Sequence, residues 1–386
     1  MKVVWVSLTF AADASPFDWL VDHVDLTVCG PSLFDRGAPG GNQNPRYEVV
    51  KLAPLPRSRW HRLAWIYRGV SDLLDEIQPD VVHIVCEPWG LIAVQLAGLL
   101  RRRAPILTLH TCDTMWFSPG FGSEPKQWLR RKLARYTLSQ TQGLAAESAE
   151  AIRQSFMGGL SQTATTALIH TNPRDPELFR PAISPEERTR DRQAMNLPTE
   201  GVGIGFLGRF LPEKGPLLFL EALQASGLLT SDLGEVWAAI AGRGPLEAEI
   251  ERSSTSTGAH FLGALDWAEV PIFYRSIDIL VVPSWKTDSW EEQSPRTIIE
   301  ALLSGCVVVG SDSGAIPSMI GEHGVVVEEK DVDELVSGLR QAIQLHKTDI
   351  GDRARASAIE RYSGSREAER LLSFWRTCID QQIGQV

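Results

Sequence analysis

The fold is indicated most directly by the stretch Gly205-Phe206-Leu207-Gly208-Arg209-Phe210-Leu211-Pro212-Glu213-Lys214-Gly215. Its first residues suit a buried strand, and a helix is expected from Pro216, because proline is favoured in the first turn of a helix. The loop between them contains two cations, Arg209 and Lys214. Free backbone N–H groups, a helix start and two cations suit a diphosphate. From the residues alone, a surface loop with two solvated charges explains the stretch equally well.

Outward from this stretch, strand-like and helical segments alternate. In the C-terminal half, strands are expected at 203–207, 236–241, 260–262, 279–282 and 307–310, and helices at 217–225, 246–253, 269–275, 298–304 and 333–344. In the N-terminal half, strands are expected at 3–8, 80–85 and 105–109, and helices at 63–77 and 91–103. Such alternation predicts parallel sheets with helices on both faces. The predicted fold class is α/β, with two doubly wound Rossmann-like domains facing across a cleft.

The domain boundaries are predicted from a stretch rich in proline and turn-forming residues at 170–176. The first domain is expected to span 1–172 and the second 173–364. A final segment at 365–386 is expected to contain a helix at 365–379. Ligands are expected at the carboxyl ends of the parallel strands, because loops and helix N-termini converge there.

Composition and charge narrow the class of protein. The chain has 38 Lys and Arg against 48 Asp and Glu, but its first 140 residues carry 16 against 13, so the acidic excess lies in the C-terminal part. An acidic protein without a basic stripe is not expected to bind nucleic acid. No apolar stretch approaches the roughly 18 residues of a membrane span, and five scattered cysteines suggest reduced thiols, so cytoplasmic residence is expected.

Two short motifs follow expected strands and are weak signals by themselves. The turn Gly242-Arg243-Gly244-Pro245 lets the backbone approach a ligand closely, although most such turns are only tight connections between a strand and a helix. His110 comes just after an expected buried strand, on the edge where ligands bind. A single histidine in that place is more often structural than catalytic.

Two glutamates, Glu292 and Glu300, frame the next candidate segment. Glu292 is expected in a loop, and Glu300 inside a helix, on the same face as Arg296. A carboxylate can accept from two sugar hydroxyls, and the N–H groups at a helix start can hold a phosphate. Taken alone, the segment fits a surface helix with an Arg–Glu pair at least as well.

Taken in order, these motifs resemble those of the GT-B glycosyltransferases, specifically glycosyltransferase family 4, the large retaining group. The ordered set lies at 208–215, 242–245, 261–263, 276–284, 292–300 and 305–317. The resemblance covers roughly residues 80–115 and 200–345. It implies transfer of a hexose-type sugar from a nucleotide sugar to a glycolipid, polysaccharide or natural-product acceptor. The first domain would bind the acceptor, the second the nucleotide sugar, and the last helix would cross back to the first domain.

The resemblance also implies roles for individual residues. The catalytic residues would be Glu292, against the donor sugar, and His110, which would hydrogen-bond the transferred sugar from the other domain. The diphosphate would be bound by Arg209, Lys214 and the backbone N–H groups of Arg296 and Thr297. The nucleoside would be bound by Glu300, Gly242, Arg243 and Gly244. The donor sugar would be bound by Gln293, Ser294 and Pro295.

The implied chemistry is a front-face displacement in which the two cations stabilise the leaving nucleoside diphosphate. No metal and no cofactor are expected. UDP-sugar is the expected donor, with GDP- or ADP-sugar as alternatives. Many relatives have Glu-Gly-Phe-Gly where this chain has Glu292-Gln293-Ser294-Pro295, and the proline has no N–H to offer a donor sugar. Many also have a Gly-Gly loop after the first strand; the Gly40-Gly41 pair comes too late in the chain to take that role.

Cations and aromatic residues mix in the N-terminal half at 57–68 and 126–136, with three arginines at 101–103. They could form a patch for anionic lipid headgroups or a lipid-diphosphate acceptor, and so place the protein at the inner face of a membrane. Helices with solvated arginines and core aromatics explain them as well. Two other functions stay open: a nucleotide-sugar epimerase of the same fold, and a non-catalytic subunit that binds a nucleotide sugar.

Overall fold

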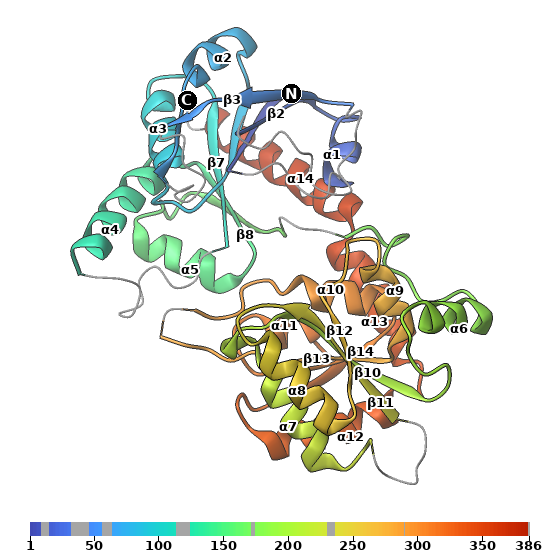
Figure 1. The fold of residues 1–386 in the computed structure, drawn as a ribbon. Helices are drawn as coiled ribbons and strands as arrows, with labels where there is room; N and C mark the ends of the chain where they lie inside the picture. Colours follow the sequence, from blue (N-terminus) through green and yellow to red (C-terminus); the bar gives the residue numbers. More distant parts are fainter. Residues whose placement is uncertain are drawn as a thin grey trace. The chain divides into compact units, whose positions relative to one another are not determined.

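A computed structural model describes residues 1–8, 15–31, 46–55, 64–112, 124–170, 174–229, 236–288 and 290–384. The chain divides into two compact units: unit 1 comprises Met1–Pro173 with Gly364–Val386, and unit 2 comprises Arg174–Ser363. The expected linker at 170–176 contains the boundary between them, although its residues 171–173 lie outside the described part. Figure 1 shows that each unit has a central sheet with helices packed against it.

Unit 2 contains a six-stranded sheet with the order β12-β11-β10-β13-β14-β15, in which the paired strands are parallel. The strands are β10 (Val202–Arg209), β11 (Val236–Arg243), β12 (His260–Gly263), β13 (Ile279–Val282), β14 (Val307–Ser311) and β15 (Gly324–Val327). The helices are α6 (Pro185–Ala194), α7 (Pro216–Ser226), α8 (Glu247–Thr257), α9 (Val270–Ser276), α10 (Arg296–Leu303), α11 (Ile316–Ile320), α12 (Val332–Leu345) and α13 (Ile350–Tyr362). Numbered within the unit, the strand order is 3-2-1-4-5-6, which is that of a Rossmann fold.

Unit 1 contains a seven-stranded parallel sheet with the order β3-β2-β1-β6-β7-β8-β9. Its strands are β1 (Lys2–Ser7), β2 (Asp25–Pro31), β3 (Glu48–Leu52), β6 (Val81–Val85), β7 (Ile106–Thr111), β8 (Gly143–Ala146) and β9 (Thr165–Leu168), beside a small pair, β4 (Pro54–Leu55) and β5 (Ile66–Tyr67). Its helices are α1 (Ser15–Leu20), α2 (Val70–Ile77), α3 (Leu91–Leu100), α4 (Glu124–Ser139), α5 (Ala149–Gly158) and α14 (Gly364–Ile383). The α/β fold class is therefore confirmed, with one Rossmann-like sheet in each unit.

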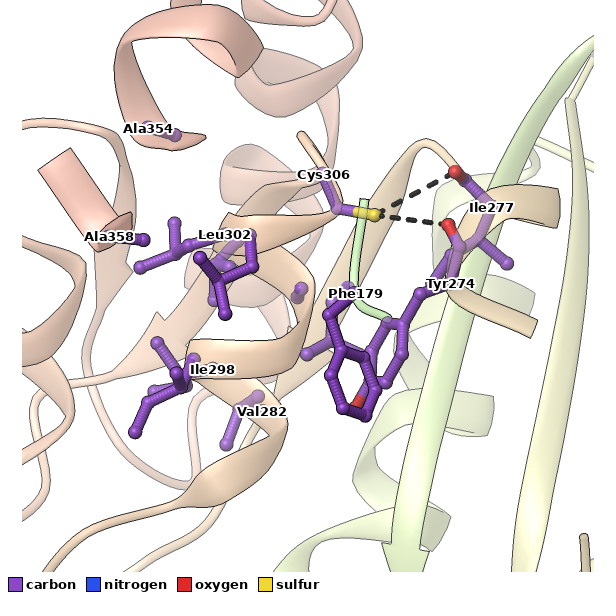
Figure 2. Packing of buried hydrophobic residues seen from close by; sticks show 14 of the residues in the cluster. Phe179, Tyr274, Ile277, Val282, Ile298, Leu302, Cys306, Ala354 and Ala358 are labelled. Atoms are coloured by element: carbon purple, nitrogen blue, oxygen red, sulfur yellow. Dashed lines mark hydrogen bonds between the residues drawn. The ribbon is translucent and has the colours of Figure 1, made fainter. Parts of the chain in front are cut away.

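Both faces of the unit 2 sheet are covered by buried apolar side chains. Figure 2 shows the cluster on one face, where Ile298 and Leu302 of α10 lie toward Ala354 and Ala358 of α13. Beside them, the Cys306 thiol donates to the backbone carbonyl oxygens of Tyr274 in α9 and of Ile277, the residue after that helix. This packing fixes α10, the helix whose first residues line the pocket described below.

One helix expected from the sequence is wrong in its first half. The segment 63–77 was expected to be a single helix, but α2 begins only at Val70, after Gly69 with φ of 77°. The residues before it form β5, which pairs antiparallel with β4. Leu63 lies outside the described residues. Tertiary pairing with β4 therefore overrides the helical spacing of residues 64–69, which would otherwise continue the pattern of α2 toward the N-terminus.

Candidate functional site

A pocket of about 460 Å3 opens in unit 2 at the carboxyl ends of β10 and β13. These are the neighbouring strands from which the chain order runs in opposite directions, so the pocket lies at the topological switch point, where ligands of open parallel sheets bind. The pocket is lined by the ends of the two strands, the loop after each, and the start of α10. Its lining residues are Phe206, Leu207, Gly208, Arg209, Lys214, Val281, Val282, Ser284, Glu292, Ser294, Pro295, Arg296 and Thr297.

The loop after β10 is held against the loop after β13 at a glycine. Gly215 has φ of 71°, and a Cβ atom there would stand 2.3 Å from the carbonyl oxygen of Pro283. Only glycine permits both this left-handed backbone and this approach. The contact places Lys214 beside Ser284 and Glu292.

An ion pair between Lys214 and Glu292 occupies one wall of the pocket. The Lys214 Nζ donates to Glu292 Oε1 over 2.5 Å, and Ser284 Oγ donates to the same oxygen over 2.8 Å. In the described part of the chain, no donor reaches Glu292 Oε2. The Lys214 side chain is 16% exposed and that of Glu292 8% exposed, so the pair is accessible from the pocket but largely desolvated.

Helix α10 begins at the pocket. Pro295 precedes its first residue with φ of −66° and provides no side-chain cap. The N–H groups of a first helical turn have no intrahelical partner, so those of Arg296 and Thr297 are available to a ligand at the pocket wall. The side chains of Arg296 and of Arg209, another lining residue, are exposed. The pocket thus contains three cations and one carboxylate.

Glu300 lies elsewhere. It is 4% exposed and is not among the residues that line the pocket. Its Oε1 accepts from Arg174 Nε over 2.7 Å and its Oε2 from the Tyr274 hydroxyl over 3.0 Å. Burial, and then the charge of Glu300, raise the pKa of Tyr274 well above its usual value, so the hydroxyl remains a donor. Arg296 and Glu300 lie four residues apart on α10 and differ in burial, since the first is exposed and the second enclosed. A contact between Glu300 and a nucleoside stays a prediction.

The glycine turn after β11 stands beside the pocket rather than in its lining. The register of β10 and β11 pairs Gly208 with Gly242 and Arg209 with Arg243. A Cβ atom on Gly242, whose φ is 147°, would stand 1.8 Å from the carbonyl oxygen of Gly208. A glycine is therefore required where the ends of β10 and β11 pack together. Neither Arg243 nor Gly244 is among the described residues that line the pocket. Their contact with a nucleoside stays a prediction.

His110 lies at the end of β7 in unit 1 and is 1% exposed. Its Nε2 is 3.0 Å from the carbonyl oxygen of Ile169, to which it can donate. Burial lowers the pKa of the ring to about 3, so the imidazole is neutral at physiological pH. In the described residues, Nδ1 has no hydrogen-bond partner. The expected hydrogen bond from His110 to a transferred sugar stays a prediction, and in this structure the ring is enclosed.

Part of the mixed cationic and aromatic sequence forms α4 in unit 1. Trp128 and Leu129 are 62% and 51% exposed, and Lys132 Nζ lies 5.8 Å from the centre of the Trp128 ring. The residues 57–63 of the other mixed segment, and Gly40-Gly41, lie outside the described residues. In the described part of the chain, no helix is long and apolar enough to span a bilayer, and no three metal-ligating side chains are clustered.

Comparison with known proteins identifies the family. The model of the family described as "Glycosyl transferases group 1" matches residues 187–358, and that of the "Glycosyl transferase 4-like domain" matches residues 18–156. The chain therefore belongs to the glycosyltransferase family that these two models describe. It is 26% identical over 336 residues to 2-deoxystreptamine glucosyltransferase of Streptomyces kanamyceticus, covering 78% of this chain and 81% of that one. It is 23% identical over 343 residues to the lipopolysaccharide core mannosyltransferase LpsB of Rhizobium meliloti, covering 82% and 87%.

Solved structures agree in fold. The Anabaena protein HepE in complex with UDP superposes with a TM-score of 0.73 at 18% identity, covering 98% of this chain and 100% of that one. A sucrose-phosphate synthase from Thermosynechococcus elongatus gives 0.70 at 16% identity, covering 99% and 100%. The fold is therefore GT-B, as the sequence motifs predicted.

Four residues of this region were given no role in the predictions from sequence. Ser284 and Trp290 contact the Lys214–Glu292 pair, and the Trp290 ring centre is 4.3 Å from Lys214 Nζ. Arg174 and Tyr274 hold Glu300. Trp290 could have been noticed from its place two residues before Glu292. Arg174 gave no signal, because it is 126 residues from its partner in sequence.

Proposed function

We propose that the protein transfers a hexose-type sugar, with retention of anomeric configuration, from a nucleoside diphosphate sugar to a glycolipid, polysaccharide or natural-product acceptor. The observation that carries the proposal is the pocket at the switch point of unit 2, with its three cations and one carboxylate. The pocket has a net charge of +2 from Arg209, Lys214, Arg296 and Glu292. A diphosphate that joins a nucleoside to a sugar has two ionised phosphates, which such a pocket neutralises.

The cations and the start of α10 would act on the leaving group. When the bond between the anomeric carbon and the phosphate oxygen breaks, its electron pair leaves with the nucleoside diphosphate. Arg209, Lys214 and the N–H groups of Arg296 and Thr297 would stabilise that charge. The acceptor hydroxyl would attack from the same face and give its proton to a phosphate oxygen. Retention follows from this geometry, and no step requires a metal or cofactor.

The remaining pocket residues would bind the sugar. Glu292 Oε2 can accept from a sugar hydroxyl, with Ser294 and Pro295 in the same wall. Gln293 follows Glu292 but is not part of the described lining. The donor would be a UDP-sugar, by analogy with the Anabaena protein solved with UDP and with UDP-glucose, with GDP- and ADP-sugars as alternatives.

The first test is donor binding. A thermal-shift screen with UDP-, GDP- and ADP-glucose should raise the unfolding midpoint with one of them, because a ligand that binds only the folded state stabilises it. That donor should be hydrolysed slowly to nucleoside diphosphate, and Lys214→Ala should slow the hydrolysis by about 100- to 1,000-fold, as expected for loss of one charge-stabilising group. Binding without any turnover on any acceptor would support the non-catalytic subunit. Conversion of the donor to its epimer would support the epimerase.

A second proposal concerns location at a membrane. Helix α4 exposes Trp128 and Leu129 among the cations Arg130 and Lys132, which is the mixture that binds anionic lipid surfaces. We propose that unit 1 contacts anionic headgroups through this helix. Flotation with anionic vesicles at low salt tests it: wild type should float, and Trp128→Ser with Leu129→Ser should not. Equal flotation of both, or of neither, would reject the proposal.

A further inference from the structure

The Lys214 ammonium is held between a carboxylate and an aromatic face. Its Nζ is 2.5 Å from Glu292 Oε1 and 4.3 Å from the centre of the Trp290 ring. A lysine side chain is long and flexible, and fixing it costs rotamer freedom when a ligand binds. A desolvated cation over the face of a tryptophan is strongly attracted to the ring. Trp290 therefore fixes the Lys214 ammonium in the pocket before any ligand arrives.

Glu292 is held from the other side by a hydroxyl. Ser284 Oγ donates to Oε1, the same oxygen that receives the lysine, while the Glu292 backbone oxygen accepts from the N–H of Ala315. Both side-chain donors therefore engage one carboxylate oxygen. Oε2 remains for a hydroxyl of the donor, and the lysine retains donors for phosphate, because an ammonium has three N–H groups.

We propose that Trp290 and Ser284 are positioning residues of the donor pocket, Trp290 for the Lys214 ammonium and Ser284 for the Glu292 carboxylate. This inference rests on the proposed function. On this proposal, the two halves of the pocket contact different parts of the donor: one binds the diphosphate and the other binds the sugar. Trp290 acts on the group that meets the diphosphate, so its loss weakens nucleoside diphosphate and nucleotide sugar alike. Ser284 acts on the group that meets the sugar, so its loss weakens only the nucleotide sugar.

A second tryptophan in the same loop provides a matched control. Trp285 is also partly buried and also lies beneath a lysine, with Lys330 Nζ 5.6 Å from its ring centre. Neither Trp285 nor Lys330 lines the described part of the pocket. Replacing Trp285 removes the same kind of ring and the same kind of cation contact, but outside the described lining of the pocket.

The experiment measures the affinity of the full-length protein for UDP, GDP, ADP and their glucose conjugates by calorimetry, and continues with the pair that wild type binds most tightly. Trp290→Leu should weaken both members of the pair about tenfold, as expected for loss of a desolvated cation–π contact. Trp290→Phe should recover most of the affinity. Ser284→Ala should weaken the glucose conjugate about fivefold and the nucleoside diphosphate less than twofold. Trp285→Leu should stay within about twofold of wild type for both.

A double-mutant cycle separates positioning from a general effect on folding. In the Lys214→Ala background, Trp290→Leu should cause no further loss of affinity, because its target is absent. An unchanged tenfold loss in that background would overturn the proposal, as would equal losses from Trp290→Leu and Trp285→Leu. If Trp290→Leu does not fold, Trp290→Met replaces it. Failure of both to fold would assign Trp290 to the core and reject the inference. A wild-type protein that binds none of the six probes would reject the proposed function itself.

Discussion

Glu292 and Glu300 belong to one short segment, and each is paired with a cation, but the two pairs differ in what surrounds them. The Lys214–Glu292 pair spans 2.5 Å, and its lysine is 16% exposed at the edge of a pocket. The Arg174–Glu300 pair spans 2.7 Å, and its arginine is 2% exposed. The first carboxylate leaves one oxygen open, whereas both oxygens of the second are engaged by Arg174 and Tyr274. The same residue type therefore lines a pocket at one end of the segment and is enclosed at the other.

Two ion pairs of one segment thus differ in access: Glu292 lines the pocket, whereas Glu300 is enclosed and is not part of the described lining. Arg174 is also tied by its backbone to the end of α13, where its N–H donates to the Tyr362 oxygen and where it bridges to Ser363. The Glu300 network thus joins α10 to the point where the chain enters and leaves unit 2. The four predictions that follow separate a role in stability from a role in activity.

The largest expected effect is on stability and concerns Arg174. Arg174→Met leaves the Glu300 carboxylate buried with no cation, which should cost about 3–5 kcal/mol of unfolding free energy. Denaturant titration measures it. The double variant Arg174→Met with Glu300→Gln should recover part of the loss, because the unpaired charge is gone. If Arg174→Met is as stable as wild type, the Arg174–Glu300 pair does not stabilise the fold, and the expected difference from the Lys214–Glu292 pair is contradicted.

The next effect is on activity and concerns Glu292. Glu292→Ala should lower the rate of donor turnover about 100-fold, or about 2.7 kcal/mol, because Lys214 loses its partner and the sugar loses an acceptor. Its unfolding free energy should fall by about 1–2 kcal/mol, less than for Arg174→Met, because the Lys214 ammonium that remains can be solvated from the pocket. Steady-state kinetics and denaturant titration on the same preparation test both numbers. Loss of stability to the extent seen for Arg174→Met would remove the distinction between the two carboxylates.

Tyr274 sharpens the comparison within the Glu300 network. Tyr274→Phe removes one donor to the carboxylate while Arg174 remains, so we expect a loss of about 2 kcal/mol, typical of a hydrogen bond to a charged group. Denaturant titration again gives the value. Donor affinity should change less than threefold once the protein is folded. A larger change in affinity than in stability would indicate that Glu300 contacts the nucleoside directly, as the family resemblance implies.

The smallest effect concerns Glu367 on α14, a third buried carboxylate, with Arg370 as its partner at 2.7 Å. Burial raises its pKa to about 7, against the opposing effects of Arg370 and the His170 N–H. A raised folded pKa means that the contribution to stability is complete below pH 4.5 and is lost as pH rises through 7. Glu367→Gln should therefore gain roughly 1 kcal/mol relative to wild type between pH 5 and pH 6. Thermal midpoints at the two pH values test it, and parallel profiles would contradict it.

Much of the lining of the unit 2 pocket could be predicted from sequence because its parts are local. The glycines, Arg209, Lys214 and the start of α10 lie in short strand–loop–helix connections, and the order of such connections sets which strand ends meet. His110 was placed correctly at the end of a strand, but its burial could not be predicted. Whether a strand-end side chain turns inward depends on what covers it, here the carbonyl of Ile169.

The sequence by itself determined the alternation of strands and helices, the GT-B fold and the family. Periodicity, turn residues and ordered motifs are properties of short contiguous stretches of the chain. Tertiary structure alone decided which of the two glutamates faces the pocket. The partners that separate them lie far apart in the chain: Lys214 is 78 residues from Glu292, and Arg174 is 126 residues from Glu300. A carboxylate is available to a ligand or sealed in the interior according to which distant side chain reaches it, and that depends on packing rather than on local pattern.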